Sequence, residues 1–127
     1  MPAAKVLRVF IVDDDENYRT ALRALVESDG MTVAGTAANG AEAVAGVKAS
    51  KADVITMDLD MPIMDGVEAT KRLAPLGIPI VIVSGSESSD RVGLAIAAGA
   101  VGSIVKAKVP DALLPLLRAV AAPSSKR

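Results

Sequence analysis

Polar side chains follow several short apolar runs of this sequence, at the points where strands would end. They are Asp13, Asp14, Asp15, Asp58, Ser84 and Lys106. Carboxylates that gather in one place repel one another unless they are protonated or bind a cation, and Mg²⁺ prefers oxygen ligands that leave room for a phosphate. A lysine and a hydroxyl beside them can bind phosphoryl oxygens. The set therefore predicts Mg²⁺-dependent phosphoryl transfer with a carboxylate as the nucleophile.

The composition excludes several other kinds of chemistry. The chain contains no cysteine and no histidine, which excludes a disulfide framework, a Cys/His zinc site, a thiol nucleophile and a Ser-His-Asp triad. The formal net charge is −1 and there is no extended basic block. This balance argues against direct nucleic-acid binding, which needs clustered Lys and Arg.

Two patterns alternate along the chain. Short apolar runs rich in β-branched residues predict strands over residues 5–12, 31–37, 53–58, 80–84 and 103–106. Segments with one apolar face predict helices over residues 17–28, 41–48, 67–73, 90–98 and 111–120. This alternation implies right-handed βαβ crossovers and a parallel sheet. We therefore predict an α/β fold: a doubly wound (βα)5 three-layer sandwich whose polar strand ends meet at one edge of the sheet.

Length and composition predict one domain over residues 1–127, with a core from about 5 to 121 and flexible tails at 1–4 and 122–127. No segment is typical of a signal peptide. The longest apolar stretch, over residues 94–105, is too short to span a bilayer and is interrupted by glycine. We expect a soluble cytoplasmic protein that does not bind membranes.

Four segments together resemble the receiver domains of two-component response regulators. They are residues 11–14 (IVDD), 53–66 (DVITMDLDMPIMDG), 81–84 (VIVS) and 99–106 (GAVGSIVK), and the resemblance extends over nearly the whole chain. It implies the flavodoxin-like strand order 2-1-3-4-5. It also implies that the phosphoryl group comes from a sensor histidine kinase, a phosphotransfer protein or a small acyl phosphate.

The resemblance assigns roles to individual acidic residues. Asp58 would be the phosphoacceptor, and Asp13 and Asp14 would be the acidic pair that holds Mg²⁺. The backbone carbonyl of Asp60 would be a further metal ligand. Asp58 would also contact the metal, so that the acceptor and the cation share one site.

The resemblance also identifies the positions that bind the phosphoryl group and switch the conformation. Ser84 occupies the hydroxyl-bearing switch position, and Lys106 occupies the position of the family's lysine. Receivers often carry Tyr or Phe three residues before this lysine, and that ring swings inward with the hydroxyl residue; here the position is Ser103. Many receivers have proline after the lysine, where this chain has Ala107. The acceptor chemistry is thus expected to be intact, while an aromatic ring at residue 103 cannot provide the output.

The expected output face is formed by the helix over 90–98, the strand over 103–106 and the helix over 111–120. Phosphorylation would change this face and control partner binding or a phosphorylation-dependent homodimer. The candidates for exposed apolar residues there are Val101, Ile104 and Leu116. In this interpretation the chain is not an enzyme for external substrates: it catalyses only its own phosphorylation and dephosphorylation, and Asp60 and Ser86 flank the path of the hydrolytic water.

Other interpretations stay open at this level. The run Asp13 to Asp15 could favour a helix N-terminus instead of a metal. The chain could be the receiver of a longer DNA-binding response regulator, or a degenerate receiver that binds partners without phosphate. The run Asp58-Leu59-Asp60 also resembles the DxD motif of aspartyl-phosphate phosphatases, but those enzymes place it after their first strand and here it follows the third predicted strand.

Overall fold

A computed structural model describes residues 6–85 and 90–121 of the chain. The sheet consists of five parallel strands in the order β2-β1-β3-β4-β5. The strands are β1 (Arg8–Val12), β2 (Thr32–Ala37), β3 (Val54–Met57), β4 (Ile80–Ser84) and β5 (Gly102–Val105). The helices of the described residues are α1 (Glu16–Ser28), α2 (Gly40–Ser50), α3 (Gly66–Leu73), α4 (Asp90–Ala98) and α5 (Val109–Ala121), with short 3₁₀ turns η1 (Ala74–Leu76) and η2 (Lys106–Lys108).

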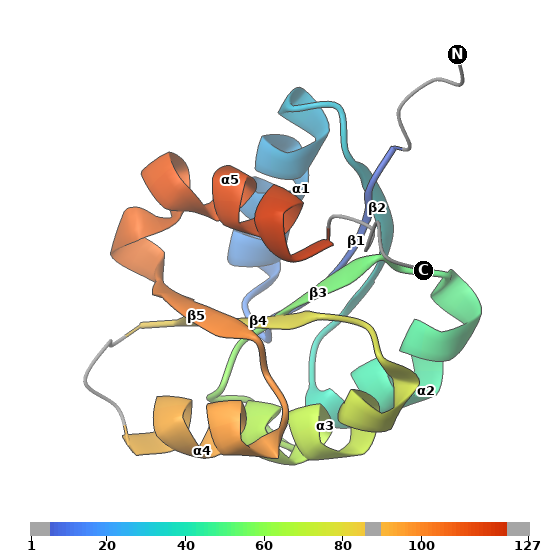
Figure 1. The fold of residues 1–127 in the computed structure, drawn as a ribbon, viewed down its shortest axis with the longest axis vertical. Coiled ribbons are helices and arrows are strands. Elements are labelled where there is room, and N and C mark those ends of the chain that lie inside the picture. Colours follow the sequence, from blue (N-terminus) through green and yellow to red (C-terminus); the bar gives the residue numbers. More distant parts are fainter. Residues whose placement is uncertain (1–5, 86–89, 122–127) are drawn as a thin grey trace.

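Helices cover both faces of the sheet, with α1 and α5 on one face and α2, α3 and α4 on the other (Figure 1). Successive residues of a strand point to opposite faces. Val9 and Ile11 of β1 accordingly pack in the core layer under α1 and α5, while Phe10 and Val12 pack in the layer under α2 and α3. The predicted doubly wound three-layer sandwich and the strand order 2-1-3-4-5 are both confirmed.

The element bounds agree with the sequence prediction most closely where apolar residues are continuous. β4 and α4 begin and end at the predicted residues, and β3 and β4 are buried along their whole length, as strands covered on both faces must be. The prediction was wrong at Lys106, which begins η2 instead of ending β5. Residue 5 and the tails 1–4 and 122–127 lie outside the described residues, so their expected flexibility stays a prediction.

The segment between β3 and α3 leaves no space for a side chain at residue 66, where α3 begins. Gly66 N donates to Leu59 O at 3.0 Å, which closes the segment on itself. A Cβ on Gly66 would lie 2.1 Å from the Asp58 carbonyl oxygen. Glycine is therefore required at this position by the close approach of two backbone segments.

No helix of the described residues is long and apolar enough to cross a membrane.

Candidate phosphoacceptor and metal site

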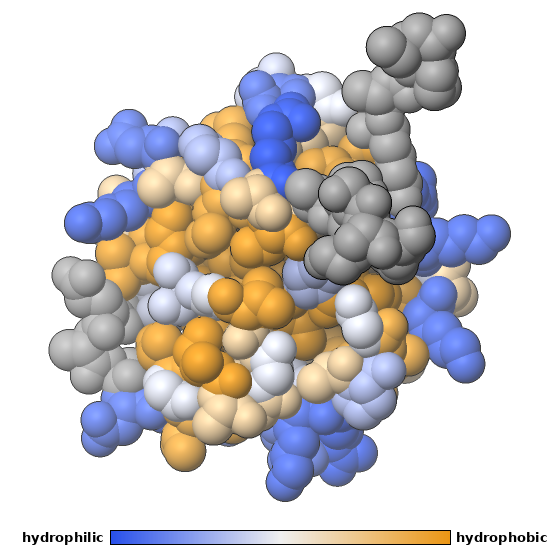
Figure 2. Space-filling model, in the orientation of Figure 1, coloured by the Kyte–Doolittle hydropathy of each residue, from blue (hydrophilic) through white to orange (hydrophobic). Residues whose placement is uncertain are grey.

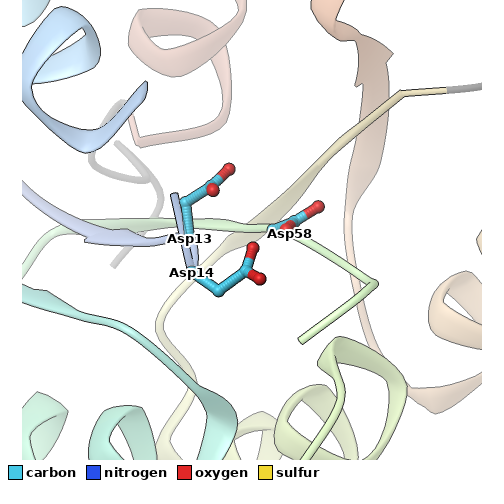
Figure 3. A group of neighbouring side chains, drawn as sticks. All are labelled: Asp13, Asp14 and Asp58. Carbon is cyan, nitrogen blue, oxygen red and sulfur yellow. The ribbon is translucent and has the colours of Figure 1, made fainter. Parts of the chain in front are cut away.

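Three carboxylates meet at the carboxyl edge of the sheet because β1 and β3 are parallel neighbours. Val12 lies opposite Met57 in the register, so Asp13 and Asp58 follow at the same level, and Asp58 N donates to Val12 O at 3.0 Å. One carboxylate oxygen from each of Asp13, Asp14 and Asp58 lies within 4.8 Å of the others. Figure 3 shows the three side chains side by side at the ends of the two strands.

The buried members of this cluster carry a charge that the fold neutralises only in part. Asp13 and Asp58 are buried, whereas Asp14 is exposed. Burial and, next, the negative charge of Asp13 raise the pKa of Asp58 to about 7, although Lys106 opposes the shift. Three carboxylate oxygens in a site open on the Asp14 side fit a hard cation that keeps some of its waters, such as Mg²⁺. The residues present therefore suit the metal that the sequence predicts.

Lys106 supplies the positive charge closest to the cluster. Its Nζ lies 3.0 Å from Asp13 Oδ2 and 4.0 Å from Asp58 Oδ1. Burial lowers the pKa of Lys106, but the hydrogen bond to Asp13 and the charges of Asp58 and Asp13 outweigh burial and leave it above its ordinary value. The ammonium group is therefore charged at neutral pH and lies beside the Asp58 carboxylate.

Tyr18 of α1 is a site residue that sequence reasoning missed. The Lys106 ammonium lies 4.3 Å from the centre of the Tyr18 ring, a cation–π contact. The Tyr18 hydroxyl is buried and has no hydrogen-bond partner among the described residues. The sequence pattern indicated only that Tyr18 lies on the apolar face of its helix, and no local signal pairs it with a lysine at the other end of the chain.

Substitutions of Tyr18 separate its ring from its hydroxyl. Tyr18→Phe is expected to raise the free energy of unfolding by about 1 kcal/mol, because it removes a buried unpaired hydroxyl and keeps the ring under Lys106. Tyr18→Leu is expected to lower it by about 1–2 kcal/mol, because the aromatic face is lost. Urea unfolding followed by circular dichroism measures both values, and a phenylalanine variant less stable than the leucine variant would contradict this assignment.

Ser84 and Ser103 lie on neighbouring strands. Ser84 is buried at the end of β4, and Ser103 is exposed on β5. They line a cavity of about 160 Å³ together with residues of α4, β5 and η2. Among the apolar residues expected on this face, Val101 is exposed and Leu116 is half-buried, but Ile104 is buried. The prediction for Ile104 was wrong because its side chain points into the core layer under α1 and α5.

The acidic run after β1 divides between two tasks. Asp15 is the N-cap of α1, and its Oδ1 accepts from Asn17 N at 2.9 Å and from Tyr18 N at 3.3 Å. Asp13 turns inward and accepts from Asp15 N at 2.9 Å. Helix capping therefore accounts for Asp15 and leaves Asp13 and Asp14 to the cluster.

The segment after Asp58 contacts an arginine that the sequence did not single out. Arg91 of α4 pairs with the carboxylates of Asp60 and Asp65 and donates from Nη2 to Leu59 O at 3.0 Å. The Asp60 side chain is otherwise exposed. Ser86, the second residue expected beside the water path, lies outside the described residues.

Comparison with known proteins shows similarity to response regulator receiver domains in both sequence and structure. Residues 9–118 match the family model of the response regulator receiver domain. The chain is 38% identical over 115 residues to the chemotaxis protein CheY of Thermotoga maritima, a match that covers 89% of this chain and 96% of that protein. The crystal structure of the response regulator domain of Thermotoga maritima CheB superposes with a TM-score of 0.87 and 32% identity, covering 94% of this chain and 99% of that domain.

Other relatives are much longer than this chain. A protein-glutamate methylesterase/protein-glutamine glutaminase of Geobacter metallireducens is 42% identical over 110 residues. That match covers 83% of this chain but only 32% of the relative. The chain thus spans about a third of the length of this relative.

Proposed function

This chain belongs to the family of response regulator receiver domains, and from that membership we propose that Asp58 accepts a phosphoryl group in a Mg²⁺-dependent reaction. The observation that carries the proposal is the cluster itself. One carboxylate oxygen from each of Asp13, Asp14 and Asp58 lies within 4.8 Å of the others, which is close enough for all three to bind one ion. Lys106 lies beside the carboxylates of Asp13 and Asp58. A site that concentrates negative charge so strongly favours a cation and a phosphoryl group that shares it.

The proposed reaction moves the phosphoryl group from a covalent bond with the donor to a covalent bond with Asp58. A carboxylate oxygen of Asp58 forms a bond to the phosphorus while the bond from phosphorus to the donor breaks, and a histidine donor leaves as imidazole. The Lys106 ammonium binds a phosphoryl oxygen, and the Ser84 hydroxyl donates to another. Asp13, Asp14, Asp58 and the Asp60 carbonyl would hold Mg²⁺, which when bound neutralises charge on the phosphoryl oxygens.

Incubation with acetyl phosphate tests this proposal directly. With Mg²⁺ present, intact mass spectrometry is expected to show one added phosphoryl group on the native chain and none on Asp58→Asn. Prior chelation of Mg²⁺ should abolish the adduct on the native chain. The same adduct on both proteins would move the acceptor elsewhere. No adduct on either, including with a panel of sensor kinases, would make the chain a phosphorylation-independent binding module.

We further propose that a sensor histidine kinase or a phosphotransfer protein is the donor, and that the chain signals instead of acting on external substrates. The DxD alternative has little support, because Asp58-Leu59-Asp60 follows the third strand and not the first. Whether residues 1–127 act alone as a single domain or regulate a larger effector, as the length of the methylesterase relative allows, is decided by the full gene sequence. Nucleic-acid binding is not assigned to this domain.

The output face that we propose lies over α4, β5 and α5. Figure 2 shows apolar surface gathered over α5 and neighbouring β5, and Leu94, Ile96 and Val101 are exposed on or next to α4. Burial of such side chains against a partner or a second copy is the favoured outcome. Light scattering with and without acetyl phosphate distinguishes the two: a doubled mass supports a homodimer, and an unchanged mass leaves binding of a different partner.

A further inference from the structure

Helix α4 is held to the rest of the fold by few buried side chains. Ala95 is its one fully buried residue among the described positions, while Leu94 and Ile96 are 57% and 43% exposed. Most helices are anchored by a stripe of buried apolar side chains. An element with so little burial opens at low free-energy cost, and its position depends strongly on its polar contacts.

Arg91 provides such contacts in the first turn of α4. Its Nη2 lies 3.0 Å from Leu59 O and 3.0 Å from Asp65 Oδ2, and its Nη1 pairs with Asp60. These three hydrogen-bonding groups all belong to residues 59–65, which directly follow Asp58. We call residues 58–66 the acceptor segment. A guanidinium presents five N–H donors in one rigid plane, whereas a lysine ammonium has three donors on a flexible stem. Arg91 therefore ties α4 to the backbone of the acceptor segment and not only to a surface carboxylate.

The acceptor segment is itself tightly fixed to Asp58. Leu59 O also accepts from Gly66 N at 3.0 Å, and Asp65 Oδ1 caps α3 through Glu68 N at 2.9 Å. Gly66 packs against the Asp58 backbone with no space for a Cβ. Close-packed segments transmit a displacement instead of absorbing it. A movement at Asp58 is thus passed to the groups that Arg91 holds.

We propose that Arg91 is the positioning residue that couples the state of Asp58 to the position of α4. This inference rests on the proposed function, because phosphorylation supplies the added charge at Asp58. It also accounts for Ser103: where β5 carries no aromatic ring, an arginine on α4 contacts the acceptor segment directly. The exposed Leu94 and Ile96 of the same helix then become the surface that responds.

Hydrogen exchange over α4 tests the coupling in the whole chain. Exchange of residues 91–98 is measured for the native protein and for Arg91→Gln, each with Mg²⁺ and with or without acetyl phosphate, while intact mass records the phosphorylated fraction. Without phosphate, Arg91→Gln is expected to exchange about threefold to tenfold faster over α4 than the native chain, because charged hydrogen bonds to a partly exposed arginine are lost. With phosphate, native α4 exchange should change, and that change should be absent in Arg91→Gln at the same phosphorylated fraction.

Two further variants make the result specific. Arg118→Gln removes a matched arginine of α5, which binds the Asp29 carboxylate at 2.7 Å and the Asp29 carbonyl at 2.6 Å far from the cluster. It should leave α4 exchange unchanged in both states. Arg91→Lys keeps the positive charge but loses the planar guanidinium. Its exchange rate over α4 should lie between those of the native chain and Arg91→Gln.

Each outcome decides the inference. Unaltered α4 exchange in unphosphorylated Arg91→Gln would overturn the tether, whatever happens at Asp58. A phosphorylated native chain whose α4 exchange does not change, or an Arg91→Gln variant that keeps the native change, would overturn the coupling. A native chain that takes up no phosphate would instead contradict the proposed function. The contact between Arg91 and the acceptor segment would still be tested, because the comparison of the two unphosphorylated chains does not depend on phosphate.

Discussion

In metal-free buffer at pH 8, Asp58→Asn is expected to raise the free energy of unfolding by about 2–4 kcal/mol. Asp58 is 6% exposed, and its charged form is disfavoured by burial and by Asp13. Asparagine has a similar shape and carries no charge. The substitution that removes the proposed chemistry should therefore make the fold more stable.

The same carboxyl predicts how stability depends on pH. The pKa of Asp58 is raised from 3.8 to about 7 in the folded chain. Between these values the folded chain binds a proton that the unfolded chain has released, so stability falls as pH rises. The contribution of Asp58 is fully present below about pH 4 and is lost as pH passes through 7.

Urea unfolding from pH 4.5 to 8.5, followed by circular dichroism, measures this dependence. The native chain should lose stability toward high pH more steeply than Asp58→Asn, and added Mg²⁺ should narrow the difference at pH 8 by offsetting the charge of the native cluster. Asp111→Asn, which changes an exposed acid in the first turn of α5, is the control and should change stability by about 0.5 kcal/mol or less. Equal stability of the native chain and Asp58→Asn at pH 8 would contradict the charge assignment.

Gly66→Ala is expected to lower the free energy of unfolding by about 3 kcal/mol or more. The new methyl group would lie 2.1 Å from the Asp58 carbonyl oxygen and 2.9 Å from the Leu59 Cα. Both are backbone atoms, so no side-chain rotation can relieve the contact. Relief requires the acceptor segment to move away from α3, which breaks the hydrogen bond from Gly66 N to Leu59 O.

Gly93→Ala is the matched control for this prediction. Gly93 lies in α4, and a Cβ there meets nothing within 4 Å. Alanine is favoured over glycine in a helix, so this variant should be more stable by about 0.5–1 kcal/mol. Urea midpoints with opposite shifts for the two variants would support the packing described here, whereas a Gly66→Ala chain as stable as the native one would refute it.

The sequence by itself determined the architecture and much of the site. Continuous apolar runs predicted the buried strands, and their ends predicted the shared edge at which Asp13, Asp14 and Asp58 gather with Lys106 beside them. These inferences succeed because strand and helix periodicities are local, and because parallel strands all end at the same edge of a sheet. The order of the strands came from the resemblance, since periodicity does not say which strand lies next to which.

Only the tertiary structure decided the contacts between distant elements. The pairing of Tyr18 with Lys106 joins the two ends of the chain, and that of Arg91 with Asp60 joins α4 to the segment after β3. The burial of Ile104 was likewise hidden, because only the packing of α5 on the sheet decides that Ile104 is covered while its neighbour Ser103 is exposed. Such contacts depend on how helices pack on the sheet and on where each side chain then points. Residue types and spacing along the chain do not contain that information.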